Sequence, residues 1–587
     1  MPKPDNLKTS LASLEPYYSE AYRKAEFVDD IYEQRFERLF DFEYDVPIHR
    51  SSTGSDIIDT FRNQMRTDEP TVRFKAAGPS RSAEEDASLM MRWGRGMLDK
   101  ERARARTDPN LQCGFDLLLR GAACKKIIVD MDSLPIEPSG PHDTEEYRAW
   151  QAAVADSWPF VTRAIDPLNV FPSPGDSRPL QFVFEKQRRT AADMWAGYPG
   201  WRDPSAARLD AKDRNNPARP VEWVEYWCAP IYSEGKLIEP GYYIVEADGD
   251  RIIDKINPYG FVPYIFEYSG IGRSSADNDP AHMMIGILHK KMGEIEAEVK
   301  LKTALSAQAM MHVFPTLLTV EDPKKVAKQF SVGPGRVVQY PPGNPPVFME
   351  HPQPNENILR FLAEIKSSLA SLHNQALLGE RPEGVDFGIH QAQLTGQALT
   401  QIRHIRSTLN LIGGQTLSMM AKMAHTFNIT MTVGGTAEKV EKPRLVHGGD
   451  FKHFGFEVDF QVIDPAENDR MLLVGENMRR AGDISRRTFH RVYAPHVVED
   501  PDEEEAAIWA ERILEQMLMS GAMAQIVLSE SGQAEVLQRA TEGVSAAKEA
   551  IQGGSLARQT EQMAGTPGAL TEPSQTAGQI AQAAGGP

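Results

Sequence analysis

The chain has 587 residues, 41% of them hydrophobic, which is enough for real cores and allows about four domains. The formal net charge is −18, from 64 basic and 82 acidic residues, whereas a repressor, polymerase or strong nuclease that grips DNA is expected to carry an excess of Lys and Arg. The sequence contains no apolar run of about 18 residues, so no transmembrane helix is expected. The three cysteines, Cys113, Cys124 and Cys228, have no CxxC spacing, which favours buried thiols over a disulfide framework.

The first part of the chain predicts helices. An apolar stripe at helical spacing precedes residue 73 and comprises Val28, Tyr32, Phe36, Leu39 and Phe40. A second, short helix is expected over residues 57–65, after a polar turn, and residues 84–123 continue as helix with Met90, Met91 and Trp93. Methionine and aromatic residues at this spacing are typical of a protein core rather than of a cofactor site.

From Lys126 the pattern changes to strands. Short β-branched or aromatic runs occupy residues 127–129, 160–165, 182–184 and 221–228. Residues 242–246 and 251–254 flank Asp248-Gly249, a pair that predicts a β-hairpin turn. We therefore expect a mixed helical and β block that ends near residue 272.

Two long helices with an irregular segment between them follow. Residues 280–312 place apolar side chains at steps of three and four, at Met284, Ile287, Leu288, Met292, Ile295 and Val299. Residues 355–377 do the same with Ile358, Phe361, Leu362, Ile365, Leu369 and Leu372. The apolar runs 314–320, 336–340 and 347–349 are separated by proline and glycine, which predicts a small β-containing knob at the tips of the two helices. A helical pair that only covers an ordinary core gives the same pattern.

The rest of the chain predicts a further long helix, strands and a helical end. Residues 379–388 are rich in turn formers, and a helix over 392–427 contains Gly413-Gly414, where we expect a kink. A strand is expected over 429–433. Over 454–462, apolar residues alternate strictly with other residues, which predicts a half-buried strand. Residues 467–551 are predicted to be helical. Residues 553–587 are rich in Gly, Ala, Gln, Thr and Pro, and we expect them to be disordered.

Several short motifs accompany this order of elements. Leu378-Gly379 and Leu394-Thr-Gly-Gln-Ala-Leu399 flank the turn-rich loop, and the β part contains Ile165-Asp-Pro-Leu-Asn-Val-Phe-Pro172 and Ile256-Asn-Pro-Tyr-Gly-Phe-Val-Pro-Tyr264. Gly482-Asp-Ile-Ser-Arg-Arg-Thr488 precedes the acidic run 499–505. In their sequential order, these features resemble the portal proteins of tailed bacteriophages and related viruses. In that family a stem helix leads to a clip, a second stem helix returns, and a tunnel loop leads into a long kinked helix.

The resemblance implies an α+β, mostly helical portal fold with eight parts. These are a wing (1–275), a stem helix (276–312), a clip (313–354), a second stem helix (355–378), a tunnel loop (379–391), a kinked long helix with returning wing strands (392–465), a helical crown (466–552) and a disordered tail (553–587).

The resemblance also implies a function and partners. The chain is expected to form a homo-oligomeric ring, a dodecamer, at one capsid vertex, as the channel for DNA packaging and ejection. Expected partners are the major capsid and scaffold proteins, the large terminase, the head-completion or adaptor protein, and double-stranded DNA that passes without sequence specificity. The expected location is the virion, and the host cytoplasm during assembly, with no membrane association.

The functional residues that the resemblance implies are positional. The tunnel loop would bring to the bore Arg381, Glu383, Val385, Asp386 and Phe387. Four lysines of the first stem helix are candidates to face the channel: Lys290, Lys291, Lys300 and Lys302. Four basic residues of the clip could face the terminase or adaptor: Lys324, Lys325, Lys328 and Arg336. A connecting surface loop gives the same pattern as a tunnel loop, and lysines on a helix often pair with nearby glutamates, here Glu294, Glu296 and Glu298.

The sequence predicts no enzyme, cofactor or metal site. Gly270-Ile-Gly272 and Gly333-Pro-Gly335 continue neither to a phosphate-binding loop nor to a dinucleotide fingerprint. His282 and His289 lack the spacing of metal ligands, and the acidic run 499–505 reads as a helix start. Two alternatives stay open: a virion adaptor or scaffold oligomer without a DNA channel, and an enzyme whose scattered carboxylates form a site that one sequence does not reveal.

Overall fold

The fold combines helices and small sheets, as expected, in two compact units, Met1–Ala466 and Glu467–Pro587. The computed structural model describes residues 3–39, 48–65, 70–76, 80–139, 144–175, 179–198, 216–273, 278–313, 356–370, 400–433, 444–460 and 465–486, together with a few shorter stretches. In the described part, no helix is long and apolar enough to cross a membrane.

Four helices dominate the start of the first unit: α1 (Leu7–Tyr32), α2 (Thr53–Gln64), α3 (Arg81–Arg104) and α4 (Pro109–Leu119). The continuous helix predicted over 84–123 is wrong, because Asp108 begins a new one. Its side chain accepts a hydrogen bond from the Asn110 N–H, and Pro109 occupies the first turn, where a missing N–H costs nothing. Gly121, at φ +83°, then turns the chain into β2 (Ala122–Val129).

Two antiparallel sheets form the β block. One has the order β11-β2-β3, with β3 (Phe160–Ile165) and β11 (Tyr264–Tyr268) flanking β2. The other has the order β10-β9-β6-β5-β4, with strands β4 (Val170–Pro172), β5 (Phe182–Thr190), β6 (Pro220–Cys228), β9 (Tyr242–Ala247) and β10 (Asp250–Ile256). The predicted hairpin β9–β10 is confirmed, and its turn residues Asp248 and Gly249 both have positive φ, as the favoured two-residue turn requires. A small hairpin, β7 (Ile231–Ser233) with β8 (Lys236–Glu239), lies between β6 and β9 in sequence.

The three-stranded sheet separates two cores. One core packs the sheet against α2, α3, α4 and α13 (Arg403–Thr426), and the other packs it against α1 and the five-stranded sheet. Side chains of β2 alternate between them, with Ala123 and Ile127 in the first and Ala122 and Cys124 in the second. The three cysteines are buried thiols, as predicted.

The first long helix is shorter than predicted. Instead of one helix over 280–312, the chain forms α8 (Pro280–Met283), the 3-10 turn η5 (Leu288–Lys291) and α9 (Met292–Val313). Between α8 and η5, two backbone groups bond to other segments and not along the helix: the Ile287 N–H donates to the Leu118 carbonyl at 2.9 Å, and the Ile285 carbonyl accepts from the Ser269 hydroxyl at 2.5 Å. A Cβ on Gly286 would lie 2.2 Å from the Leu119 carbonyl oxygen, so the crossing over the end of α4 requires glycine.

Helix α13 runs without a break through Gly413 and Gly414. A Cβ on Gly414 would lie 2.7 Å from the carbonyl oxygen of Phe456, so the glycines let strand β16 (Phe456–Asp459) approach the helix. The two glycines therefore allow the close approach of β16 to α13, whereas the sequence predicted a kink at these positions. The alternation predicted over 454–462 is confirmed within β16, whose Phe456 and Val458 are buried. Its partner is β1 (Thr71–Phe74), which lies in a region predicted to be helical. The local pattern did not reveal this strand, because its pairing with β16 is a contact between residues far apart in sequence.

Further described elements belong to both units. In the first, β14 (Thr430–Val433) pairs with β15 (Arg444–His447), and α5 (Glu145–Asp156), η3 (Pro167–Asn169) and α6 (Ala191–Gly197) connect strands. At the second unit, α14 (Pro465–Ala481) is the principal described element. The rest of the predicted crown is largely outside the described residues, and the predicted tail is entirely so.

Candidate functional site

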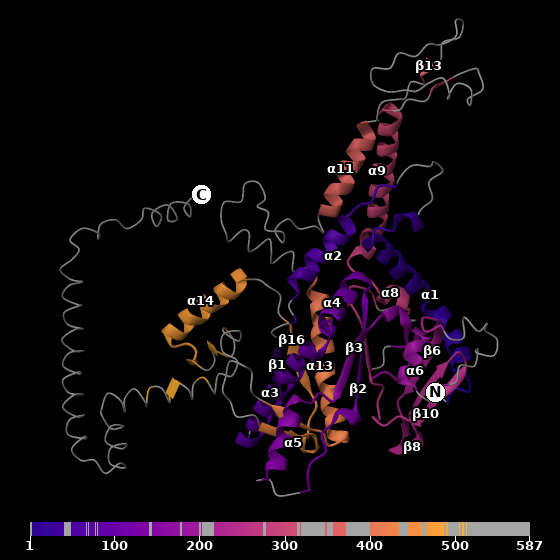
Figure 1. Ribbon diagram of the computed structural model, residues 1–587. Helices are drawn as coiled ribbons and strands as arrows, with labels where there is room; N and C mark the ends of the chain where they lie inside the picture. The colour runs from indigo at the N-terminus through magenta and orange to yellow at the C-terminus, as the bar shows by residue number, and fades with distance from the viewer. Residues whose placement is uncertain are drawn as a thin grey trace, which may run out of the picture. The chain divides into compact units, whose positions relative to one another are not determined.

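The two predicted stem helices lie side by side. α9 and α11 (Glu356–Ala370) contact each other and extend away from the sheets of the first unit (Figure 1). At about 1.5 Å per residue, the 22 residues of α9 span about 33 Å. The inner halves are anchored, because Ile295 and Val299 of α9 and Ile365 and Leu369 of α11 are buried in the core that includes α4 and α13.

The outer halves of the two helices are not covered. Leu359 is 51% exposed and Phe361 is 50% exposed, although the sequence places Phe361 on the apolar side of the helix. From Ala304 to Ala309, no side chain of α9 is buried. The structure therefore answers one question that the sequence left open: the helical pair covers the core only with its inner half and presents apolar side chains beyond it.

A pair of two-residue strands belongs to the segment between the helices. β12 (Leu317–Leu318) pairs in antiparallel fashion with β13 (Val347–Phe348), and β13 lies beyond the outer ends of α9 and α11 (Figure 1). The first and third predicted apolar runs of the knob therefore contain paired strands. The four basic residues predicted for the clip interface, Lys324, Lys325, Lys328 and Arg336, lie outside the described residues, as do those of the tunnel loop, Arg381, Glu383, Val385, Asp386 and Phe387.

Three of the four predicted stem lysines form ion pairs along η5 and α9. Lys302 Nζ lies 2.6 Å from Glu298, and Lys300 pairs with Glu296 one turn away. Lys291 Nζ lies 2.8 Å from Glu294 and 2.6 Å from Ser368 Oγ, so it also ties α9 to α11. Lys290 is exposed and has no ion-pair partner within the described part of the chain. The pairing predicted as the alternative thus occurs, and the channel-facing role of these lysines stays a prediction.

The base of α9 is fixed by buried polar contacts. The Nδ1 of His289 accepts a hydrogen bond from the Gly286 N–H at 2.9 Å, and burial together with the charge of Lys24 lowers the pKa of His289 to about 4. Glu298, which is buried, accepts a hydrogen bond from Ser51 Oγ at 3.2 Å. The His49 N–H donates to Thr303 Oγ1 at 2.9 Å. These contacts connect η5 and the inner half of α9 to residues 49–51 and to Gly286.

Two buried lysines of β2 were not identified from the sequence. Lys125 Nζ lies 2.8 Å from Glu101 of α3, and on the opposite face of the strand Lys126 Nζ lies 3.0 Å from Glu185 and 2.7 Å from Glu225. Burial alone would lower the pKa of Lys126, but the charges of the two carboxylates outweigh burial and the net shift is upward. Adjacent lysines inside an otherwise apolar strand were the available signal, because such lysines are rarely buried without partners.

The Asp-Pro motif has a structural role. Asp166 caps the η3 turn by accepting from the Leu168 N–H, and it lies 2.6 Å from Arg120 Nη1. Arg120 also binds Asp29 of α1 through two nitrogens, at 2.9 Å each, and approaches Asp116 at 3.7 Å. One guanidinium therefore joins α1, the end of α4 and the turn after β3. Burial raises the pKa of Asp116 to about 7, although Arg120 acts in the opposite direction.

No protein-family model matches the chain, and no curated protein matches it. No group of three or more His, Cys, Asp or Glu side chains with metal-binding geometry occurs among the residues that the structure describes.

Proposed function

We propose that the chain is the subunit of a portal-like ring at one capsid vertex, through which double-stranded DNA is packaged and ejected. The proposal rests on the sequence resemblance, and one structural observation supports it most. The helix pair α9–α11 is anchored at its base in the core, while Leu359 and Phe361 on its outer half are half exposed. In a ring, a neighbouring subunit would cover apolar side chains that project in this way, since exposed apolar surface can mark a site of protein association.

In this proposal the two helices are the stem and the segment with β12 and β13 is the clip. The clip would contact the large terminase and later the head-completion protein, and residues 379–391 would narrow the bore. The chain would act mechanically, without catalysis or cofactor. The net charge of −18 fits a channel whose wall repels the duplex and does not hold it.

The primary experiment is oligomer analysis of the purified chain by mass photometry and negative-stain microscopy. We expect rings with a central opening wide enough for duplex DNA. Leu359→Ser combined with Phe361→Ser should weaken ring formation, whereas Lys366→Ser, an exposed polar change on the same helix, should not. A chain that stays monomeric at every concentration refutes the proposal, and closed plates or rings without an opening favour the adaptor alternative. Metal-dependent nuclease activity of the purified chain would favour the enzyme alternative.

A second experiment addresses the tunnel loop. Deletion of residues 379–389 should leave ring formation intact and reduce DNA packaging or retention in an assembly assay. Unchanged packaged DNA length in the deletion variant would show that the loop role is wrong, without bearing on the ring itself.

A further inference from the structure

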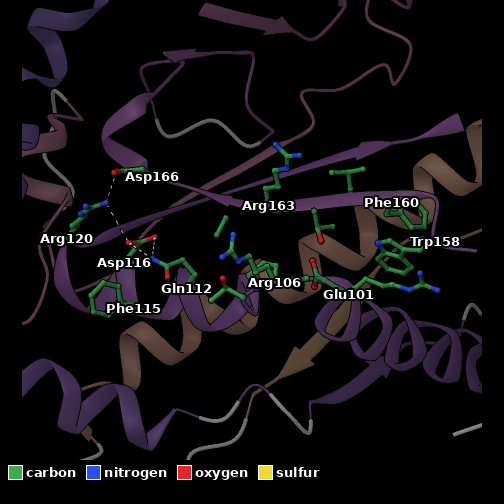
Figure 2. Close-up of a pocket in the computed structure, with 17 residues that line it drawn as sticks. Glu101, Arg106, Gln112, Phe115, Asp116, Arg120, Trp158, Phe160, Arg163 and Asp166 are labelled. Atoms are coloured by element: carbon green, nitrogen blue, oxygen red, sulfur yellow. Dashed lines mark hydrogen bonds and ion pairs between the residues drawn. The ribbon is translucent and has the colours of Figure 1, made fainter. Parts of the chain in front are cut away.

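A cavity of about 700 Å³ lies along strand β3, outside the helix pair discussed above. Its other wall is formed by the end of α3, the connection to α4, and the first turns of α4. Figure 2 shows Arg120 with Asp116 and Asp166 at one end of the cavity, and Trp158 and Phe160 at the other. Five consecutive residues of β3, 160–164, line it. Because side chains alternate between the faces of a strand, contact with every residue means that the cavity lies against the edge of β3 and not over one face.

The register shows which backbone groups of β3 face the cavity side. The Asp130 N–H donates to the Pro159 carbonyl at 2.7 Å, and the Ile127 N–H donates away from β3, to Pro263 at 3.0 Å. In an antiparallel pair the bonded positions alternate, so residues 161, 163 and 165 bond to β2. The N–H and C=O groups of Phe160, Thr162 and Ala164 therefore point outward, and no hydrogen bond to any of them occurs within the described residues.

Two other sheet edges of the first unit are contacted by side chains of helices. The hydroxyl of Tyr18 donates to the Pro172 carbonyl at 2.8 Å, and that of Tyr22 donates to the Val170 carbonyl, so α1 covers the edge strand β4. Thr408 Oγ1 of α13 donates to the Tyr268 carbonyl of β11 at 3.1 Å. An uncapped edge is a template for strand addition, which proteins normally block unless they use it.

The charges around the cavity select an anionic occupant. Its three acidic side chains already have cationic partners, because Glu101 binds Lys125, and Asp116 and Asp166 lie next to Arg120. Arg106 and Arg163 are exposed and have no acidic partner in the part of the chain that the structure describes. In a chain with a net charge of −18, two uncompensated guanidinium groups beside a free strand edge form a local excess of positive charge.

We propose that the edge of β3 and the adjoining cavity bind an extended acidic segment of a partner protein, which pairs with β3 as an additional antiparallel or parallel strand. Six residues match the length of β3, about 20 Å. Main-chain hydrogen bonds to Phe160, Thr162 and Ala164 supply affinity, and carboxylates near Arg106 and Arg163 supply selectivity. Apolar side chains of the segment contact Trp158 and Phe115 in the cavity wall.

The test uses the full-length protein and fluorescein-labelled six-residue peptides of alternating valine and glutamate, measured by fluorescence anisotropy. We expect saturable binding that weakens by about tenfold or more when alternate peptide nitrogens are methylated, since two or three hydrogen bonds are lost. Arg106→Glu combined with Arg163→Glu should weaken binding by a similar factor. Lys236→Glu, an exposed charge reversal outside the cavity, should not.

A protein variant tests the same backbone groups. Thr162→Pro removes an outward N–H without removing a bond to β2, a substitution that edge strands tolerate. It should reduce peptide binding, and the methylated peptides provide the same test without altering the protein. Equal binding of a valine–lysine peptide, or no saturable binding up to about 1 mM peptide, overturns the proposal. Binding of the acidic peptide that methylation leaves unchanged also overturns it, and would indicate a site for small organic anions.

Discussion

The buried ion pair between Lys125 and Glu101 gives the sharpest prediction about stability. Both side chains are completely buried, and Lys125 Nζ lies 2.8 Å and 3.0 Å from the two carboxylate oxygens and 2.8 Å from Asn110 Oδ1. Lys125→Met preserves the length of the side chain but leaves the Glu101 carboxylate without a cation, with only the Asn110 amide at 3.2 Å as a donor. We expect the free energy of unfolding to fall by about 3–5 kcal/mol, because an unpaired buried charge retains its desolvation cost.

A double variant separates the loss of the ion pair from the cost of burying an unpaired charge. Lys125→Met with Glu101→Leu removes both charges, so unfolding stability should return to within about 1–2 kcal/mol of the original protein or exceed it. Lys300→Met provides a control at a more exposed pair and should change stability by about 1 kcal/mol or less. Urea unfolding monitored by tryptophan fluorescence measures all three variants. A double variant as unstable as Lys125→Met would refute the reasoning, as would a single variant that loses no more than the control.

Three further predictions concern titration and packing. The folded-state pKa of His289, about 4, is below its ordinary 6.5, so its contribution to stability is complete above pH 6.5 and is lost as the pH falls toward 4. His289→Asn, which keeps an acceptor for Gly286, should flatten this decline in urea unfolding at several pH values, and a decline of unchanged slope would contradict the assignment. The folded-state pKa of Asp116, about 7, is above its ordinary 3.8, so stability falls as the pH rises through 7. Asp116→Asn should therefore raise the thermal midpoint at pH 8 and change it little near pH 4; an equal shift at both pH values would exclude a titration effect. Gly414→Ala should destabilise by about 1–3 kcal/mol, because the added Cβ meets the Phe456 carbonyl oxygen, whereas Gly96→Ala in α3, with open space around it, should stabilise by up to about 1 kcal/mol. Calorimetry that shows the same sign for both alanine variants would disprove the packing argument.

Local patterns predicted the elements whose conformation depends on near neighbours. The Asp248-Gly249 turn was predictable because few residue pairs accept positive φ at both positions. The alternation of Phe456 and Val458 identified β16, and the apolar periodicity identified α9 and α11 even though their packing partners lie far away in sequence. In each case the information is carried within about ten neighbouring residues.

Contacts between distant residues decided the rest. Apolar periodicity continues through residues 284–287, yet the helix breaks there because the end of α4 supplies the hydrogen-bond acceptor Leu118. Residues 71–74 form a strand because β16 is available beside them. Likewise, the two adjacent lysines of β2 indicate buried partners, but which carboxylates pair with Lys125 and Lys126 depends on contacts with distant segments.

By itself, the sequence determined the mixed helical and β class, the two amphipathic helices with a proline-rich segment between them, and the negative charge. Only the tertiary structure decided that the inner halves of α9 and α11 are buried while Phe361 is exposed, and that the edge of β3 is open beside Arg106. The physical reason is the range of the interactions along the chain. Periodicity states which side of a helix or strand is apolar, but whether that side is covered depends on surfaces contributed by residues hundreds of positions away.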